Sequence, residues 1–223
     1  MTPAEYLNTA RVPDSLKPQC FGQWEILRQP MPRLPERFGG SFDWRHMTIL
    51  RREVPMDYGN MHKEDDQGRV WDVVMEDSAP ELRRHLPIWM CARGRVLITG
   101  LGLGCVIRGL LANPRVSHID VVEIDPDIIR VLGKEFRKSP RVKIHQGDAL
   151  TIEFPAYKKW DYAWHDIWHE QGNSKLQLLH AELMVRFRDR VKHQQGAWAF
   201  PRDMKKFWGR FYPLLGAPKV RAA

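Results

Sequence analysis

The sequence predicts an α/β fold, a doubly wound and mainly parallel sheet preceded by a small N-terminal cap that contains strands. From residue 95 onward, short apolar segments of strand character alternate with segments of helical period. A glycine-rich turn joins the first of these strands to the first helix, and β-branched and aromatic runs come before them. This alternation is typical of a parallel sheet that helices cover on both faces.

The cap is expected over residues 1–77. Residues 1–40 hold six prolines, so we expect them to be irregular, with at most short helices. Residues 41–77 resemble strands joined by turns, because residues 69–75 are β-branched and aromatic. A helix should then begin after Ser78, with Glu81 completing a capping box, and run to about Cys91, where Gly94 supplies a left-handed exit.

The main domain is expected over residues 78–200. Strands are predicted at residues 96–99, 119–124, 142–145, 161–165 and 197–200, and helices at residues 105–111, 127–136 and 174–190. Residues 201–223 are expected to form a third region, a basic and aromatic C-terminal helix or tail.

The strongest functional pattern lies at the ends of three successive strands. Gly100, Gly102 and Gly104 follow the first strand, where a sharp turn leaves bare backbone for a ligand to approach. Glu123 ends the second strand, where a carboxylate can accept hydrogen bonds from both ribose hydroxyls of an adenosine. Asp148 follows the third strand, beside the expected place of the adenine. Because open α/β sheets bind ligands at these strand ends, the pattern predicts one adenosine pocket.

The glycine spacing favours S-adenosylmethionine over NAD or ATP. The dinucleotide fingerprint would require glycine where this chain has Cys105, and no phosphate-binding lysine follows the glycines. A cofactor without a pyrophosphate fits this loop better.

These motifs resemble class I S-adenosylmethionine-dependent methyltransferases of the spermidine-synthase-like branch, over roughly residues 78–170. The resemblance is carried by residues 96–104 (VLITGLGLG), 121–126 (VVEIDP), 146–149 (QGDA) and 160–168 (WDYAWHDIW). It implies a Rossmann-like fold that binds S-adenosylmethionine, with the three glycines in the cofactor loop. By the same resemblance, Glu123 would hold the ribose, Asp148 and Ala149 would face the adenine, and Ile124 would also belong to the cofactor-binding residues. Thr99 departs from the family, because many members carry an acid there.

The segment after the fourth strand supplies the catalytic candidates. Asp166 is the best candidate for a catalytic or positioning residue, and His169 could act as a base near neutral pH. Aminopropyltransferases carry a second acid where this chain has His169, which disfavours polyamine synthesis but leaves an aminopropyltransferase as an alternative. His165 and His169 would share a metal only on a helix, so no metal site is predicted.

Tryptophans in this part of the chain fall into two groups. Trp164 and Trp168 are expected to form pocket walls, because they flank Asp166. Trp71 and Trp198 are expected to belong to the core, which is the commoner place for this residue type.

The net charge of +8 is concentrated near the C-terminus. Residues 171–223 carry eleven Lys and Arg against three Asp and Glu, so nucleic-acid contact through residues 186–210 is one hypothesis and a solvated basic helix is the other. The methyl acceptor is left open between a small molecule and a nucleic acid. A non-catalytic module that binds nucleic acid is a further alternative, and a homodimer is compatible with the sequence.

The setting follows from absences in the sequence. No apolar run is long enough to span a bilayer, and the first ten residues lack the features of a secretory signal. The three cysteines suggest no disulfide framework, so we expect a cytoplasmic protein without membrane contact.

Overall fold

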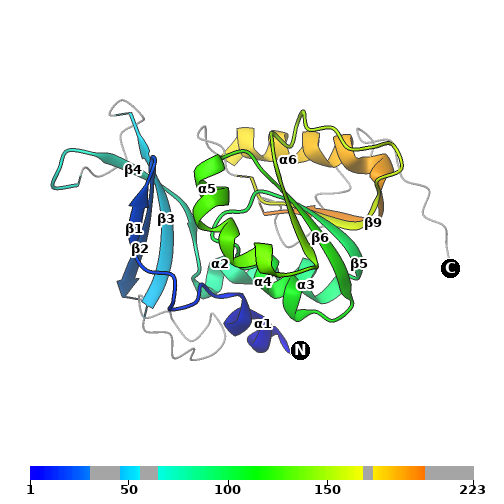
Figure 1. Ribbon diagram of the computed structural model, residues 1–223, viewed down its shortest axis with the longest axis horizontal. Helices are drawn as coiled ribbons and strands as arrows, with labels where there is room; N and C mark the ends of the chain where they lie inside the picture. Colours follow the sequence, from blue (N-terminus) through cyan, green and yellow to red (C-terminus); the bar gives the residue numbers. More distant parts are fainter. Residues whose placement is uncertain (31–45, 56–64, 168–172, 199–223) are drawn as a thin grey trace.

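The computed structural model describes residues 1–30, 46–55, 65–167 and 173–198, which form two sheets side by side (Figure 1). A four-stranded sheet in the order β1-β2-β3-β4 lies at the left of Figure 1. A five-stranded sheet in the order β7-β6-β5-β8-β9 lies to its right, with α6 on one of its faces. None of the described helices is long and apolar enough to cross a membrane.

The first sheet is antiparallel throughout. Its strands are β1 (Gln19–Phe21), β2 (Trp24–Pro30), β3 (His46–Val54) and β4 (Val70–Glu76). β3 and β4 confirm the strands expected after residue 41. The expectation of irregular structure before residue 40 is wrong for β1 and β2. Prolines 18 and 30 flank this hairpin or end it, and Gly22 at φ 56° allows the two-residue turn that pairs Phe21 with Trp24.

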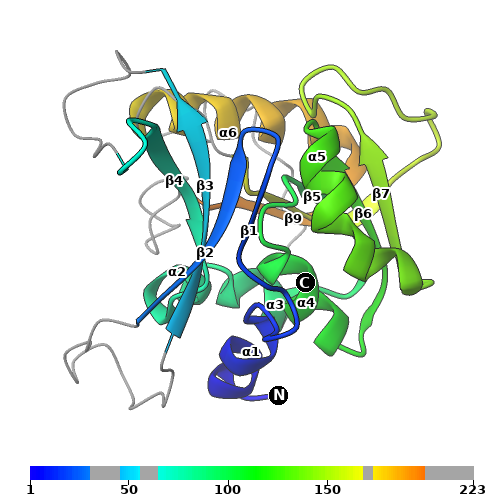
Figure 2. The ribbon, with the colours of Figure 1, turned by 60° about the vertical axis from the view of Figure 1, so that its left-hand side comes forward.

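A short helix, α1 (Pro3–Ala10), precedes the hairpin and agrees with the short helices expected there. Thr2 and Glu5 form a capping box at its start. Tyr6, Leu7 and Ala10 are buried, and α1 packs against α3 and α4 of the second sheet's layer, as Figure 2 shows. The N-terminus therefore joins one hydrophobic core with the main domain.

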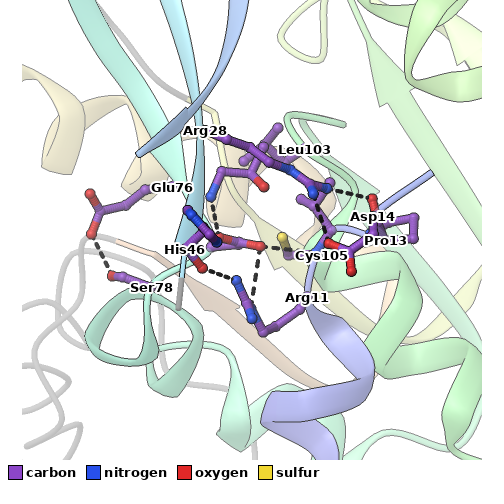
Figure 3. Close-up of polar contacts among 12 residues, drawn as sticks. Arg11, Pro13, Asp14, Arg28, His46, Glu76, Ser78, Leu103 and Cys105 are labelled. Carbon is purple, nitrogen blue, oxygen red and sulfur yellow. Dashed lines mark hydrogen bonds and ion pairs between the residues drawn. The ribbon is translucent and has the colours of Figure 1, made fainter. Parts of the chain in front are cut away.

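Buried polar contacts fix the chain between α1 and the first sheet. Asp77 is fully buried and accepts hydrogen bonds from the backbone N–H groups of Val12 at 3.1 Å and Thr48 at 2.6 Å. Figure 3 shows Arg28 reaching the carboxylate of Asp14, at 2.7 Å, and Arg11 reaching the carbonyl of His46. These contacts satisfy backbone groups that burial would otherwise leave without partners.

The second sheet is parallel in every described pair and confirms the predicted doubly wound α/β fold. Its strands are β5 (Gly94–Thr99), β6 (Val116–Glu123), β7 (Val142–Gln146), β8 (Trp160–His165) and β9 (Val191–Ala197). Its helices are α4 (Cys105–Ala112), α5 (Pro126–Val131), η2 (Gly133–Lys138), α6 (Asn173–Phe187) and η3 (Arg188–Arg190). Along β5, Val96 and Ile98 pack with α4, whereas Leu97 packs with α6 on the other face.

The predicted helix over residues 78–91 is instead two short helices, α2 (Ala79–Arg83) and α3 (Leu86–Cys91). The predicted capping box is also wrong, because the Ser78 hydroxyl donates to Glu76 on β4 and makes no cap bond (Figure 3). Pro87 lies in the first turn of α3, where its missing N–H is harmless. The break leaves Glu81 and His85 free to point toward the main sheet. Gly94 has the expected left-handed backbone, but at the start of β5.

Two other boundaries differ from the prediction. The helix expected over residues 127–136 divides into α5 and η2. The fifth strand lies at residues 191–197, whereas the prediction placed it at residues 197–200. The prediction missed its start because this is an edge strand whose first residues are mostly exposed and polar. Such a strand has no apolar run to find in the sequence. The predicted tail over residues 201–223 lies outside the described residues.

Candidate functional site

A cavity of about 420 Å³ lies at the carboxyl ends of the parallel strands. The four-stranded sheet covers it through Trp24, Leu50 and Met75 among others. Most of the predicted site residues line it together, namely Gly100, Gly102, Glu123, Ile124, Asp148, Ala149 and Asp166. His169 and Trp168 lie outside the described residues.

The first two glycines make room where the chain is most crowded. Gly100 has φ 92°, and a Cβ there would lie 2.2 Å from the carbonyl oxygen of Asp166. Gly102 has φ 48°, and a Cβ there would lie 2.6 Å from the Met75 sulfur. Any side chain at either position would collide and be strained. The cavity is therefore bordered by bare backbone at these two positions.

Gly104 is not among the residues that line the cavity. It is the N-cap residue of α4 at φ 79°, and a Cβ there would lie 2.4 Å from the Phe136 ring. Its glycine is explained by close helix packing, and a direct place in the cofactor loop stays a prediction.

Glu123 ties the end of β6 to the glycine loop. Its carboxylate accepts hydrogen bonds from the backbone N–H groups of Leu101 at 2.8 Å and Asp125 at 2.9 Å. Burial raises the pKa of Glu123, while these backbone hydrogen bonds lower it. A carboxylate has about four lone-pair sites. Glu123 therefore keeps lone-pair capacity for a ligand in the cavity.

Asp125 connects the cavity to the four-stranded sheet, a link that the sequence reasoning missed. One of its oxygens caps α5 through the N–H groups of Asp127 at 2.8 Å and Ile128 at 3.2 Å. The other accepts a hydrogen bond from the Trp24 indole at 2.9 Å. Trp24 belongs to a strand that the proline content had concealed.

Asp148 and Ala149 border the cavity after β7. The Asp148 carboxylate accepts a hydrogen bond from the Leu150 N–H at 2.9 Å and so shapes the loop that follows. Ala149 is buried, whereas Ile124, which also lines the cavity, is 63% exposed. Apolar lining of this kind suits a flat base.

Asp166 lies at the other end of the cavity, beside the glycine loop. Its backbone N–H donates to the carbonyl of Thr99 at 2.8 Å. Burial raises the pKa of the Asp166 carboxyl to about 8, and the charge of Glu81 adds to this. Burial likewise raises the pKa of Glu81 to about 7, against a hydrogen bond from Trp198 and the charge of Arg84.

The tryptophans differ from the prediction. Trp198 was expected in the core but lines the cavity, and its indole donates a hydrogen bond to Glu81. Trp164 was expected as a pocket wall but is buried in the core and does not line the cavity. Trp71 is buried, as expected, with the guanidinium of Arg51 4.4 Å from its ring centre.

Two histidines near the site are fully buried and uncharged. Burial lowers the pKa of His85 to about 3 and that of His165 to about 4. His165 lies 3.1 Å from the hydroxyl of Thr99 and 3.1 Å from the side-chain oxygen of Gln195. Within the described residues, no group of three or more His, Cys, Asp or Glu side chains could hold a metal ion.

His85 has no such partners within the part of the chain that the structure describes. There, neither of its ring nitrogens makes a hydrogen bond, although the side chain is fully buried. Its Nε2 lies 3.9 Å from a carboxylate oxygen of Asp166. Sequence reasoning missed His85 and Glu81, because it placed both in one ordinary amphipathic helix.

The described part of the basic segment makes internal contacts. Arg186 donates to the carbonyl of Ile152, and Arg190 donates to the carbonyls of Phe154 at 3.2 Å and Pro155 at 2.9 Å. Both arginines therefore hold the loop between β7 and β8, whatever else they contact.

Sequence comparison finds methyltransferases over part of the chain. A 60-residue segment is 42% identical to the ribosomal RNA small subunit methyltransferase A of Pseudomonas syringae pv. tomato, covering 27% of this chain. A 64-residue segment is 41% identical to the enzyme of the same name from Dechloromonas aromatica, covering 29% of this chain. The matches span 22% and 24% of these relatives. No protein-family model matches the sequence.

Structural comparison finds partial matches among solved structures. A spermidine synthase in complex with the transition-state analogue AdoDATO has a TM-score of 0.42 at 19% identity, covering 69% of this chain and 53% of that one. A dimethyladenosine transferase from Plasmodium falciparum has a TM-score of 0.34 at 22% identity, covering 44% and 35%. The resemblance to class I methyltransferases predicted from the motifs is thus matched by similarity in sequence over the segments above.

Proposed function

We propose that this chain is an S-adenosylmethionine-dependent methyltransferase. One observation carries the proposal: Gly100, Gly102, Glu123 and Asp148, from three successive strand ends, border a single cavity. The partial similarity to curated methyltransferases supports it independently.

The residues of the cavity fit this cofactor. Bare backbone at Gly100 and Gly102 lets a ligand lie directly on the loop. Glu123 keeps lone-pair capacity for a sugar hydroxyl beside its backbone hydrogen bonds. A volume of about 420 Å³ is within the usual range for a small-molecule site.

S-adenosylmethionine supplies a methyl group on a sulfonium, and its transfer is an in-line displacement. The chain then contributes alignment and exclusion of water rather than covalent chemistry. Glu123 would hold the sugar, Ile124 and Ala149 would flank the base, and Trp24, Leu50 and Met75 would cover the site. Asp166 remains a proposed catalytic or positioning residue, as does His169.

A thermal-shift titration of the full chain tests the proposal. S-adenosylmethionine and S-adenosylhomocysteine should both raise the melting temperature, since they bind the folded state only, and NAD and ATP should not. Glu123→Gln should weaken the affinity for both ligands about tenfold and so reduce both shifts. The reason is that the NH2 group of an amide cannot accept hydrogen bonds as the second carboxylate oxygen does. The exposed Glu153→Gln serves as a matched control. No response of the wild-type chain to either ligand would reject the proposal.

A nucleic acid is the acceptor class that we favour. The curated relatives are named for ribosomal RNA, and the excess positive charge near the C-terminus would attract phosphates. Methyl transfer from radiolabelled cofactor should therefore appear in RNA or DNA rather than in protein or amine pools. Aminopropyl transfer from decarboxylated cofactor to putrescine would instead select the aminopropyltransferase. Salt-sensitive nucleic-acid binding without methyl incorporation would select the non-catalytic module.

The remaining expectations belong to the same proposal. The chain would divide into a cap over residues 1–77, a cofactor domain over residues 78–200 and a C-terminal region over residues 201–223. Cys20, Cys91 and Cys105 are all free thiols, which suits a reducing, cytoplasmic setting.

A further inference from the structure

A second pair of acidic side chains lies in the cavity, away from Glu123 and Asp148. Glu81 comes from α2, and Asp166 follows β8 next to Gly100. The side chains of both are 15% exposed. They are close enough that the charge of Glu81 raises the pKa of Asp166. This pair contributes nothing to the sugar and base subsites described above.

The protonation of this pair depends on what lies between the two carboxyls. Burial raises the pKa of Glu81 to about 7 and that of Asp166 to about 8, so near neutral pH these carboxyls hold protons for much of the time. An opposite charge within about 4–6 Å favours the ionised form of a carboxyl. A cationic ligand group between the two would therefore lower both pKa values, so that both carboxyls release their protons and ionise around it.

His85 lies directly beside Asp166. The imidazole is fully buried, neither ring nitrogen has a hydrogen-bond partner among the described residues, and Nε2 is 3.9 Å from the Asp166 carboxylate. An unpaired buried polar group is costly, by about 1–3 kcal/mol. A small movement of Asp166 would let the neutral imidazole donate its N–H to the carboxylate. His85 is thus placed to orient an ionised Asp166.

Thr99, at the end of β5, carries no negative charge. Its hydroxyl lies 3.1 Å from His165 Nδ1, and the other ring nitrogen of His165 lies 3.1 Å from the side-chain oxygen of Gln195. Across the glycine loop, Glu123 on β6 and Asp166 after β8 lie on the two sides of β5. A nucleoside whose sugar lies at Glu123 would extend its amino-acid chain over Gly100 toward Asp166.

We propose that Glu81 and Asp166, with His85 behind Asp166, bind the ammonium group at the amino-acid end of the cofactor. This inference rests on the proposed function. It gives Asp166 a binding role in place of the base role predicted from the sequence.

Three ligands and one substitution test it on the full chain. S-adenosylhomocysteine keeps the ammonium without the sulfonium, and 5′-methylthioadenosine keeps the nucleoside but lacks the whole amino-acid end. Glu81→Gln should weaken binding of S-adenosylmethionine and S-adenosylhomocysteine by about tenfold or more, the usual effect of losing a charged hydrogen bond. Binding of 5′-methylthioadenosine should change less than about twofold. Calorimetry measures all three affinities without any need for turnover.

Controls separate this subsite from the fold and from the function. Glu153→Gln makes the same change at an exposed side chain outside the cavity lining and should leave all three affinities unchanged. Retained 5′-methylthioadenosine binding shows that the variant is folded. Asp166→Asn should reproduce the selective loss.

Three outcomes would overturn the inference. Equal weakening of S-adenosylhomocysteine and 5′-methylthioadenosine would mean that Glu81 supports the whole cavity. Weakening of S-adenosylmethionine alone would mean that the pair faces the sulfonium, and no weakening would mean that it binds neither charge. Failure of the wild-type chain to bind any of the three ligands would instead reject the proposed function itself.

Discussion

The indole N–H of Trp24 donates a 2.9 Å hydrogen bond to the carboxylate of Asp125, 101 residues later in the chain. The bond joins β2 of the antiparallel sheet to the first turn of α5, which Asp125 caps. Both residues line the cavity. The four-stranded sheet is therefore attached to the cofactor site at the point where it covers that site.

Trp24→Phe should loosen this attachment while keeping an aromatic ring in place. Losing one hydrogen bond to a charged group lowers the free energy of unfolding by about 1.5–3 kcal/mol. The melting temperature should fall by several degrees, at about 2–4 °C per kcal/mol for a chain of this size. Calorimetric melting measures the change.

The control for Trp24→Phe is Tyr157→Phe, at a side chain that is 84% exposed. Cofactor affinity should also weaken in Trp24→Phe, by the same factor for S-adenosylhomocysteine and 5′-methylthioadenosine. A variant with unchanged melting temperature and unchanged affinities would show that the sheet does not depend on this bond.

Gly100→Ala should abolish cofactor binding, because the new Cβ would lie 2.2 Å from the Asp166 carbonyl oxygen. Gly68→Ala is a matched control: Gly68 also has a positive φ, 74°, but nothing lies within 4 Å of its Cβ. Gly68→Ala should cost only the left-handed strain of about 1–2 kcal/mol. Chemical denaturation and ligand-binding measurements on both variants separate the effect of left-handed backbone strain from that of the steric collision at residue 100. Equal behaviour of the two would mean that the close approach at Gly100 is unimportant.

The parts of the site that the sequence could predict are local. Gly100, Gly102, Glu123 and Asp148 each follow a strand whose apolar run is visible in the sequence, and parallel strands bring their carboxyl ends to one edge. Those residues could therefore be placed together without any knowledge of tertiary contacts.

The parts that could not be predicted depend on distant contacts. Trp24 lines the cavity and lies on β2, a strand that pairs with β3. The sequence analysis had expected irregular structure where β2 lies. Glu81 on α2 lines the cavity, and His85 lies beside Asp166 at the break between α2 and α3, where one continuous helix was predicted. Trp198 lines the cavity and Trp164 lies in the core, the reverse of the prediction. A sequence pattern does not tell which side chains near the end of a strand the rest of the fold will cover.

Asp120 is a buried charge whose loss should destabilise the fold far from the cofactor loop. It is fully buried in β6 and accepts hydrogen bonds from His145, Lys158 and Trp160, each at about 2.8 Å. Burial alone would raise the pKa of Asp120, but these hydrogen bonds outweigh it and hold the pKa well below its usual range. Asp120 therefore stabilises the protein at neutral pH, and its contribution is lost as the pH falls below about 4.

Asp120→Asn should lower the free energy of unfolding at neutral pH by about 3 kcal/mol, the usual effect of removing one partner of a buried ion pair. Urea denaturation measures it, and Asp189→Asn, at a side chain that is 88% exposed, is the control. Equal denaturation midpoints for the two variants would show that Lys158 and His145 find other partners.

Glu81 and Asp166 should make the protein less stable as the pH rises. Their pKa values in the folded chain, about 7 and about 8, are above those of an unfolded chain, near 4. A raised folded pKa gives a contribution that is complete below about pH 4 and is lost as the pH rises through about 7 to 8. The surrounding charges are Arg84 and Glu76 near Glu81, and His85 near Asp166.

Urea denaturation between about pH 6.5 and about pH 8 should show the last part of this loss, with a slope of up to about 1.4 kcal/mol per pH unit for each carboxyl that flattens above about pH 8. The buried histidines His85, His165 and His180 act in the opposite range, because their lowered pKa values reduce stability only below about pH 6.5. A chain that carries both Glu81→Gln and Asp166→Asn should therefore keep its stability in alkaline buffer. Saturating S-adenosylhomocysteine should flatten the wild-type curve in the same range, because the ammonium would favour both ionised carboxylates. If 5′-methylthioadenosine flattened it equally, the ammonium would not be the group that the two carboxylates meet.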